Sequence, residues 1–174
     1  EKAELTLQEN DVFVVASKII SRAENCFVNL KEVIASPAAF GLASKAEKDN
    51  KMVEQILRES NGVSRIRPGV FIVRSRLGIV SANAGIDSSN AQPPGNPEGD
   101  WVLLLPKDPD ESAVGIRQTL EKKFRCRLGV IVSDSMGRPF RFGTTGFAIG
   151  LAGVPALLDY RGTDDLYDRP LSHT

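Results

Sequence analysis

Two acidic side chains that follow apolar runs are the strongest candidates for chemistry in this 174-residue chain. The first, Asp87, lies in the segment Asn83–Asn90 (NAGIDSSN), directly after the apolar run Gly78–Ala82. A carboxylate after a strand, beside a glycine that lets backbone approach a ligand, is typical of a cation or phosphate site. Asn90 adds both an acceptor and donors. The alternative is a turn in which Asp87 and Asn90 cap local backbone.

The second acidic residue, Asp134, follows the buried-strand pattern Leu128–Ser133. We expect Asp134 at the carboxyl end of that strand, where ligand crevices of α/β proteins form. Two carboxylates from different strand ends could share one divalent cation, with Ser135 adding an oxygen. Arg138 and Arg141 follow closely and suit phosphate or carboxylate. The alternative is a helix cap followed by solvated arginines.

A third segment, Ser17–Glu24, follows the apolar run Asp11–Ala16 and contains Lys18 and Arg22. A cation placed there could reach a nucleotide phosphate, although the segment has no P-loop pattern. The alternative is an ordinary surface turn. The glycine-rich stretch 137–153 has no G-x-G-x-x-G, and we expect it to serve tight packing and turns.

Composition excludes several classes of function. Lys plus Arg equals Asp plus Glu at 22 each, which argues against a dedicated nucleic-acid binder. His173 is the only histidine and is next to last, so a Ser-His-Asp mechanism or a His-rich zinc site is not expected. Any metal should be a hard one such as Mg²⁺ or Mn²⁺. Cys26 and Cys126 are expected to be reduced thiols of a cytoplasmic protein, and no run predicts a membrane span or signal peptide.

The elements that must position these residues alternate only in part. Apolar runs predict strands at 11–16, 26–30, 70–74, 78–82, 101–105 and 128–133. Helical spacing predicts helices at 37–46, 51–60 and from Asp108 to about Phe124. A hairpin is expected at Leu77-Gly78, a long loop over 83–99, and a charged, turn-rich tail from Asp159. The pattern predicts a mixed α/β (α+β) fold with mixed sheets and packed helices, not a regular Rossmann or TIM fold.

Several motifs in a fixed order resemble the coenzyme F(420)-0:γ-glutamyl ligase family. They are VVASKIISRAE (14–24), ANAGIDSSN (82–90), LLLP (103–106), DPDESA (108–113), IVSDSMGR (131–138), GFAIGLAG (146–153) and DLY (165–167). The matches cover nearly the whole chain. Several motifs in order are far more specific than any one of them alone.

The resemblance implies a GTP-dependent ligase that needs Mg²⁺ or Mn²⁺, often with K⁺. GTP would phosphorylate the terminal carboxylate of the deazaflavin precursor F(420)-0, and the amine of L-glutamate would attack that acyl phosphate. Asp87 and Asp134 would be catalytic metal ligands with Ser135 beside the metal. The nucleotide would contact Ser17, Lys18, Arg22 and Asn90. A homodimer acting on small molecules, without nucleic acid or membrane, is also implied.

The chain departs from the family pattern at several points. Family chains start earlier and continue past Thr174, so we expect 1–174 to be a single ligase-like domain without those terminal segments. Arg22 replaces a usual lysine, Asp168 a usual glycine, and the loop 91–100 is longer and proline-rich. Two alternatives therefore stay open: a nucleotide-dependent ligase for a different carboxylate, and a non-catalytic nucleotide- or metal-binding relative. The choice between GTP and ATP is also open.

Overall fold

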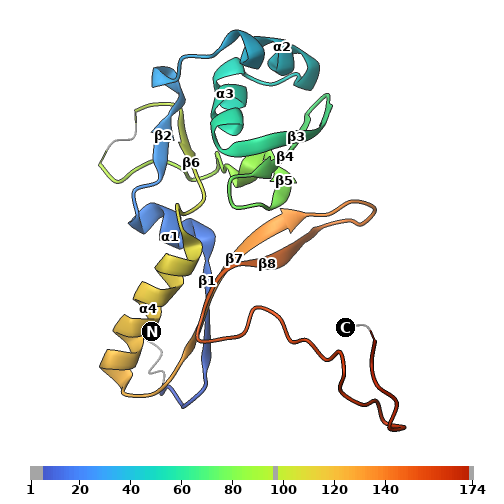
Figure 1. The fold of residues 1–174 in the computed structure, drawn as a ribbon. Coiled ribbons are helices and arrows are strands. Elements are labelled where there is room, and N and C mark those ends of the chain that lie inside the picture. The colour runs from blue at the N-terminus through green and yellow to red at the C-terminus, as the bar shows by residue number, and fades with distance from the viewer. Residues whose placement is uncertain (1–5, 96–97, 173–174) are drawn as a thin grey trace.

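The computed structural model describes residues 6–95 and 98–172, so His173 lies outside the described residues. Figure 1 shows short strands and helices arranged in two parts, one above the other. The strands are β1 (Val12–Ala16), β2 (Phe27–Asn29), β3 (Ser60–Arg67), β4 (Val70–Ser75), β5 (Val80–Ala82), β6 (Trp101–Leu103), β7 (Gly129–Gly137) and β8 (Thr144–Ala152). The helices are α1 (Ser17–Ala23), α2 (Pro37–Ala46), α3 (Asn50–Arg58) and α4 (Pro109–Phe124), with 3₁₀ turns η1 (Leu30–Glu32) and η2 (Asn83–Gly85).

The first part is a three-stranded mixed sheet in the order β1-β7-β8, packed against α1 and α4. β1 pairs with β7 in parallel, and β7 pairs with β8 in antiparallel fashion. The first turn of α4 lies directly on β8, because a Cβ at Gly150 would lie 2.3 Å from the carbonyl oxygen of Pro109. Its apolar core consists of Ile20, Ala113, Val130, Val132 and Ala152.

The second part is the antiparallel sheet β3-β4-β5, with α2 and α3 packed beside β3 (Figure 1). The antiparallel pair β2-β6 runs alongside and contributes to the same core. That core is larger than the first: Leu30, Val33, Ala39, Ala43, Ala46, Val53, Ile56, Phe71, Val73, Ala84, Ile86 and Val102. Asp87 comes directly after Ile86, which belongs to this core, whereas Asp134 lies two residues beyond Val132 of the smaller core.

Local capping explains where the longer helices start. The Ser36 hydroxyl accepts the N–H of Ala39, and Pro37 fills the first helical position of α2. Asp108 caps α4 in the same way by accepting the N–H of Glu111. The predicted helix 37–46 is therefore confirmed, as is the helix that starts after Asp108. The mixed α+β class is also confirmed, because parallel and antiparallel pairs occur in one sheet.

Three predictions about elements are wrong. The helix predicted to run to Ser60 ends at Arg58, and β3 starts at Ser60. β7 does not end at Asp134 but continues to Gly137, so Asp134 lies within a strand. The glycine-rich stretch packs tightly at Gly150 and Gly153, as expected, but it is not mainly turns, since its residues 144–152 form β8, which pairs with β7 from Val130 to Gly137. Pairing with β7 satisfies the backbone of this stretch despite its glycines.

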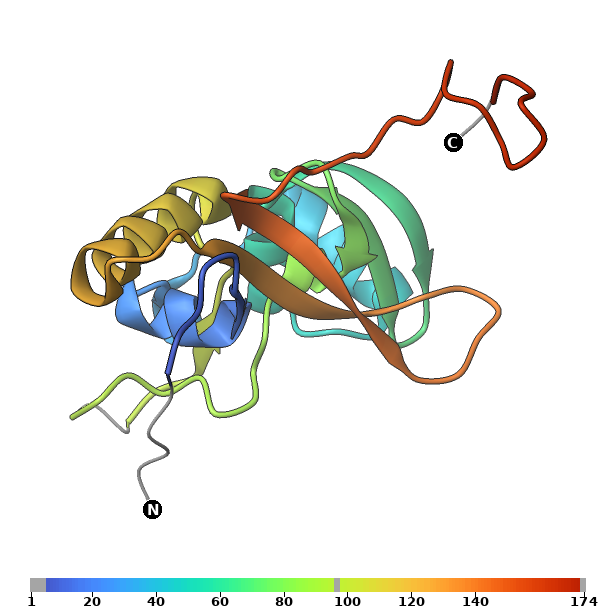
Figure 2. The same ribbon diagram turned by 90° about the horizontal axis from the view of Figure 1, so that it is seen from below.

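The β7–β8 hairpin and the C-terminal segment both project from the body of the molecule (Figure 2). The predicted turn-rich tail is confirmed over the described residues, which form turns around a short bridge between Asp164 and Pro170. Over the described part of the chain, no helix is both long and apolar enough to cross a membrane.

Candidate functional site

Asp87 is presented by an unusual backbone turn. Asn83, Ala84 and Gly85 take φ values of 52°, 56° and 76°, three consecutive residues in the left-handed region. Such a conformation is unfavourable for residues with a side chain, so it persists only where the surroundings impose it. Gly85 also has no room for a Cβ, which would lie 2.7 Å from Cδ1 of the buried Leu105. The turn is therefore fixed by both conformation and packing.

The backbone of Asp87 is tied to β6 on the other side of the loop. Its N–H donates to the carbonyl oxygen of Leu103 at 3.0 Å, and its carbonyl accepts the N–H of Leu103 at 2.8 Å. Ile86, immediately before, is buried in the larger core. Because the backbone of Asp87 is paired with Leu103 and the preceding Ile86 is buried, the Asp87 carboxylate is held in place although it lies in a loop.

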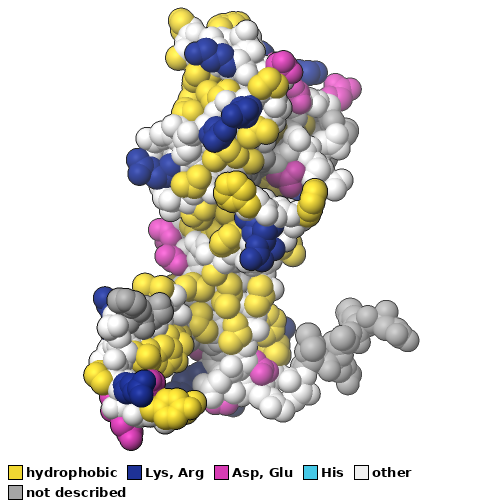
Figure 3. Space-filling view, turned by 90° about the vertical axis from the view of Figure 1, so that its right-hand side faces the viewer, with side chains coloured by type: hydrophobic (Ala, Val, Ile, Leu, Met, Phe, Trp, Pro, Cys, Tyr) yellow, Lys and Arg dark blue, Asp and Glu magenta, His cyan; other side chains and the backbone are white. Residues whose placement is uncertain are grey.

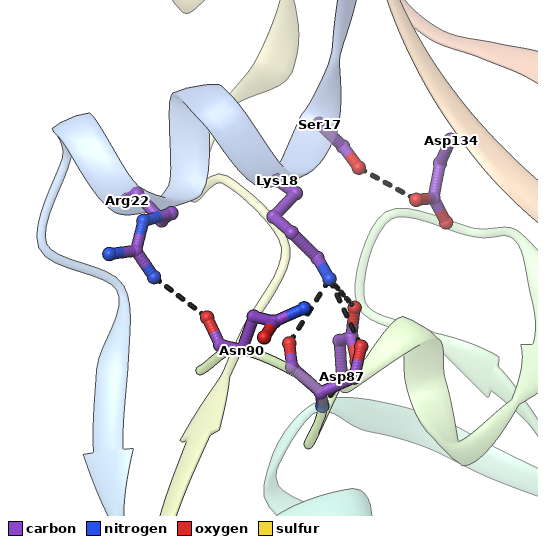
Figure 4. Close-up of polar contacts among 7 residues, drawn as sticks. Ser17, Lys18, Arg22, Asp87, Asn90 and Asp134 are labelled. Carbon is purple, nitrogen blue, oxygen red and sulfur yellow. Dashed lines mark hydrogen bonds and ion pairs between the residues drawn. The ribbon is translucent and has the colours of Figure 1, made fainter. Parts of the chain in front are cut away.

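Asp134 is placed by the register of the parallel pair. Ala16, the last residue of β1, lies opposite Ser133, so the next residues on each chain are neighbours. Those residues are Ser17 and Asp134, and the Ser17 hydroxyl donates to Oδ1 of Asp134 at 2.6 Å (Figure 4). Asp134 therefore lies where β1 ends, although its own strand continues. The sequence predicted that Asp134 lies at the carboxyl end of its own strand. It lies instead beside the carboxyl end of β1, within β7.

Lys18 connects the first turn of α1 to Asp87. Its ammonium lies 2.6 Å from Oδ2 of Asp87 and donates to both the carbonyl and the hydroxyl of Ser89 at 3.1 Å. Oδ1 of Asp87 accepts the N–H and the hydroxyl of Ser89, each at 2.7 Å. Figure 4 shows Lys18 and Asp87 pointing toward one another across the gap between α1 and the loop.

These contacts set the acidity of Asp87. Partial burial on its own raises the pKa of the carboxyl group, but the hydrogen bonds from Lys18 and Ser89 outweigh it. The pKa of Asp87 is therefore held below its ordinary value, and the group is ionised at neutral pH. An ionised carboxylate is the form that binds cations.

Arg22 and Asn90 meet one helical turn farther along α1. The Arg22 guanidinium donates to the backbone carbonyl of Asn90 at 2.7 Å and lies over the ring of Phe27 at 5.3 Å. Asn90 itself adopts a left-handed φ of 50°. Residues of α1 thus contact the loop 86–90 at two points, through Lys18 and through Arg22.

A small cavity of about 50 Å³ lies where these segments converge. It is lined by Ser17, Lys18, Ser21, Gly85, Asp87, Leu103, Leu104, Leu105 and Asp134. The space suits an ion or a few water molecules and is far smaller than a drug-sized ligand needs. Asn90 and Arg22 do not line it, and neither does Ser135. Strand alternation directs the exposed Ser135 side chain to the face of β7 opposite Asp134.

Comparison with known proteins identifies the family of the chain. The family model described as F420-0:Gamma-glutamyl ligase matches residues 1–174, the whole chain. The chain belongs to this ligase family. The "Coenzyme F420:L-glutamate ligase" of Methanopyrus kandleri is 46% identical over 174 residues, covering 100% of this chain and 66% of that protein. The proteins of the same name from Methanocaldococcus jannaschii and Archaeoglobus fulgidus are each 40% identical, over 99% and 96% of this chain.

The chain spans just under two thirds of the length of these ligases, 66% for the M. jannaschii protein and 64% for that of A. fulgidus. The match of the family model and the identity to these ligases confirm the family predicted from the motifs. The motif segments VVASKIISRAE and ANAGIDSSN, which carried the resemblance, are the segments that α1 and the η2 loop bring together in space.

The divalent cation that this ligase family implies fits the donors of the cavity. Two carboxylates, Asp87 and Asp134, and the Ser17 hydroxyl supply hard oxygen donors, which suit Mg²⁺ or Mn²⁺. Within residues 6–95 and 98–172, no group of three or more His, Cys, Asp or Glu is arranged to hold a metal. The metal therefore stays a prediction, and an ion bound at these oxygens would have to take its remaining ligands from water or phosphate.

Two serine residues at the site were not predicted from the sequence. Ser89 holds Asp87 through two hydrogen bonds and also contacts Lys18. The D-x-S spacing of an Asx-type turn was a signal that could have identified it. Ser21, which is buried and lines the cavity, had no signal beyond its place one turn after Ser17.

Proposed function

We propose that the protein joins L-glutamate to the terminal carboxylate of the deazaflavin precursor F420-0 in a GTP-dependent reaction. The observation that carries the proposal is the convergence of Asp87 and Asp134 on one small cavity, held there by Ser17 and Lys18. Family membership supports the same reaction, since the named relatives are coenzyme F420:L-glutamate ligases.

The proposed chemistry has two steps. A carboxylate oxygen of the acceptor attacks the γ-phosphorus of GTP, and GDP leaves. The amine of L-glutamate then attacks the acyl carbon, inorganic phosphate leaves, and the amine proton passes to solvent. A divalent cation bound by Asp87 and Asp134 would neutralise charge that develops on the phosphoryl group. No step needs a histidine.

The residues of α1 suit the handling of phosphate. Lys18 and Arg22 are four residues apart, so both face the loop 86–90, where they already contact oxygens. A phosphate oxygen that entered this gap would meet the same two cations. The Ser17 hydroxyl and the Asn90 amide add uncharged polar groups, and we assign all four residues to nucleotide binding. Ser135 stays a prediction from the sequence, because its exposed side chain lies on the face of β7 opposite Asp134 and does not line the cavity. We propose K⁺ as an additional ion.

We also propose a homodimer. Two aromatic side chains at the tip of the β7–β8 hairpin, Phe140 and Phe142, are fully exposed, and exposed aromatic groups of this size commonly mark protein contacts. We place the protein in the cytoplasm because both cysteines, Cys26 and Cys126, are unpaired and a reducing compartment keeps them so.

Calorimetric titration of GTP and ATP, each with and without Mn²⁺, tests the assignment of the site. We expect Mn²⁺-dependent binding of GTP that is lost in Asp87→Asn and in Asp134→Asn. Glu47→Gln, a matched loss of one negative charge at the exposed end of α2, should bind normally. Normal binding by both aspartate variants would reject these residues as the metal site. Tighter binding of ATP than of GTP would reject the nucleotide assignment alone.

The acceptor is tested separately with the intact protein, GTP, Mn²⁺, L-glutamate and F420-0. We expect a product heavier by one glutamyl group, detected by mass spectrometry. GTP binding without product would point to a ligase for a different carboxylate. Absence of turnover with every carboxylate offered would favour a non-catalytic relative.

A further inference from the structure

Asp87 has both carboxylate oxygens engaged within the protein. Oδ1 accepts two hydrogen bonds from Ser89, and Oδ2 lies 2.6 Å from the ammonium of Lys18. The Ser89 contacts come from a residue of the same rigid turn, whereas the Lys18 contact comes from the end of a flexible four-carbon chain. Oδ2 is therefore the oxygen whose partner can be exchanged.

The ammonium and a divalent cation cannot share this oxygen at close range. Mg²⁺ binds carboxylate oxygens at about 2.0–2.1 Å, inside the space that Lys18 now approaches. Two cations within a few ångströms repel strongly in a partly buried site. The Lys18 side chain is 36% exposed, so solvent lies on one side of it and leaves a path of departure.

The other contacts of Lys18 indicate where it would go. Both are to oxygens of Ser89, at 3.1 Å, and both are neutral acceptors that a phosphate oxygen can replace with a stronger, charge-assisted bond. The backbone of Lys18 does not need to move, because the preceding Ser17 stays bonded to Asp134. Only the side chain has to swing.

We infer that the ammonium of Lys18 occupies the divalent-cation position at Oδ2 of Asp87. The ammonium leaves this position when a nucleotide phosphate arrives and binds it. This inference rests on the proposed function, since it assumes a cation at Asp87 and a phosphate beside α1. Its consequence is coupling: the nucleotide removes the competitor of the metal, so each ligand strengthens the binding of the other by the same factor.

Arg22 offers a matched control on the same helix. It carries the same charge and also faces the loop 86–90, but it donates to the backbone carbonyl of Asn90 and not to a carboxylate. Removing Arg22 therefore removes one positive charge near the site without freeing an oxygen of Asp87. Lys18→Met and Arg22→Met keep most of the apolar stem of each side chain.

The first test is titration of the metal-free intact protein with Mn²⁺, following free Mn²⁺ by electron paramagnetic resonance. Without nucleotide, Lys18→Met should bind Mn²⁺ about tenfold more tightly than the wild type, within the usual range of coupling between sites. Arg22→Met should not bind it more tightly. With GDP present, the wild type should gain Mn²⁺ affinity and Lys18→Met should gain much less.

A second readout follows Lys18 itself. Acetylation of Lys18 by an amine-reactive reagent, measured by peptide mass spectrometry, should rise when Mn²⁺ is added and fall again when GDP is added. In Asp87→Asn the rate should be high and independent of Mn²⁺. Labelling of Lys123, an exposed lysine in the last turn of α4, provides the reference rate.

The outcomes separate the inference from the proposed function. If Asp87→Asn loses Mn²⁺ but Lys18→Met binds it no better than the wild type, the site stands and the exchange is rejected. If Mn²⁺ binding is absent from the wild type with GDP, or unaffected by Asp87→Asn, the metal site itself is wrong and the exchange is rejected with it. Tighter binding in Lys18→Met together with Mn²⁺-dependent labelling supports the exchange.

Discussion

Asp87 and Asp134 carry the same functional group in different settings. Asp87 sits in a loop but is fixed by Ser89, Lys18 and the paired backbone of Leu103. Asp134 sits in a long strand, and its side chain accepts a hydrogen bond from the Ser17 hydroxyl. The orientation of the Asp87 carboxylate therefore depends on its hydrogen-bond partners, whereas the position of Asp134 depends on the pairing register of β1 with β7.

The lowered pKa of Asp87 makes part of the stability depend on pH. A carboxyl group whose pKa is lower in the folded state adds stability above its unfolded pKa of about 3.9, and this is lost as pH falls through the folded value. We expect Asp87→Asn to lower the free energy of unfolding by about 1 kcal/mol at pH 7 in the metal-free protein. Urea unfolding at several pH values measures it.

The difference between the wild type and Asp87→Asn should shrink as pH falls from about 4 through the lower folded pKa of Asp87, because the carboxyl group then becomes protonated and is uncharged like the amide. A difference of constant size down to pH 3 would show that the amide acts through packing or a lost hydrogen bond and not through charge.

Ser89 should affect metal binding although it is not a ligand. Ser89→Ala removes the hydroxyl that contacts both Asp87 and Lys18, so the carboxylate gains freedom. We expect Mn²⁺ affinity in the presence of nucleotide to fall several-fold, since loss of an outer partner typically costs 10–100-fold at metal sites with better-defined shells. The exposed neighbour Ser88, changed to alanine, is the control and should leave the affinity near that of the wild type.

The sequence was sufficient to propose Asp87 and Asp134 but not their connections. The contact of Ser17 with Asp134 follows from the alignment of β1 with β7, and a single sequence does not reveal which strands pair or in what register. One departure from the family pattern has a local explanation. Asp168 has a φ of 58°, in the region where glycine is the usual residue and aspartate is tolerated.

At the level of elements, the turn before Asp87 tolerates little change. Gly85→Ala would place a Cβ 2.7 Å from a buried leucine at a φ of 76°. Both effects are unfavourable, and we expect a loss of about 1–3 kcal/mol in the free energy of unfolding, measured by urea denaturation.

Gly41 gives the matched control for that substitution. It lies exposed within α2, and a Cβ there meets nothing within 4 Å. Gly41→Ala should therefore stabilise the protein by up to about 1 kcal/mol. Equal losses in the two variants would mean that the η2 turn carries no special constraint.

The elements that sequence reasoning missed share a cause. β3 (Ser60–Arg67) is mostly polar, contains one glycine and is largely exposed beside β4, so its apolar pattern is weak. β8 contains two glycines and is stabilised by its pairing with β7 rather than by its own composition. Helix α2, by contrast, carries its start signal in Ser36 and Pro37 and was predicted with the correct ends.

At the scale of the whole molecule, the contact of the proposed dimer lies on the face with the β7–β8 hairpin. Figure 3 shows hydrophobic side chains gathered over much of this side of the molecule, with Lys and Arg among them. Phe140 and Phe142 contribute exposures of 103% and 104% at the hairpin tip. Two exposed phenylalanines on either side of Arg141, between Arg138 and Gly143, are unusual for a surface that faces only water.

If the protein is a dimer as proposed, Phe140→Ser combined with Phe142→Ser should weaken self-association at least tenfold, measured by sedimentation equilibrium. The exposed Ile34, far along the chain near η1, provides the control as Ile34→Ser and should leave association unchanged. An unaltered dimer in the double variant would place the interface elsewhere.

The two carboxylates of the site belong to different apolar cores, and this has a consequence for unfolding. Asp87 follows Ile86 of the larger core, and Asp134 follows Val132 of the smaller one. A cation bound by both carboxylates would bind the folded chain, in which they converge, and not the unfolded chain, so it would stabilise the packed arrangement of the two cores. Calorimetry should then show the cores melting together with the cation bound and more independently after its removal.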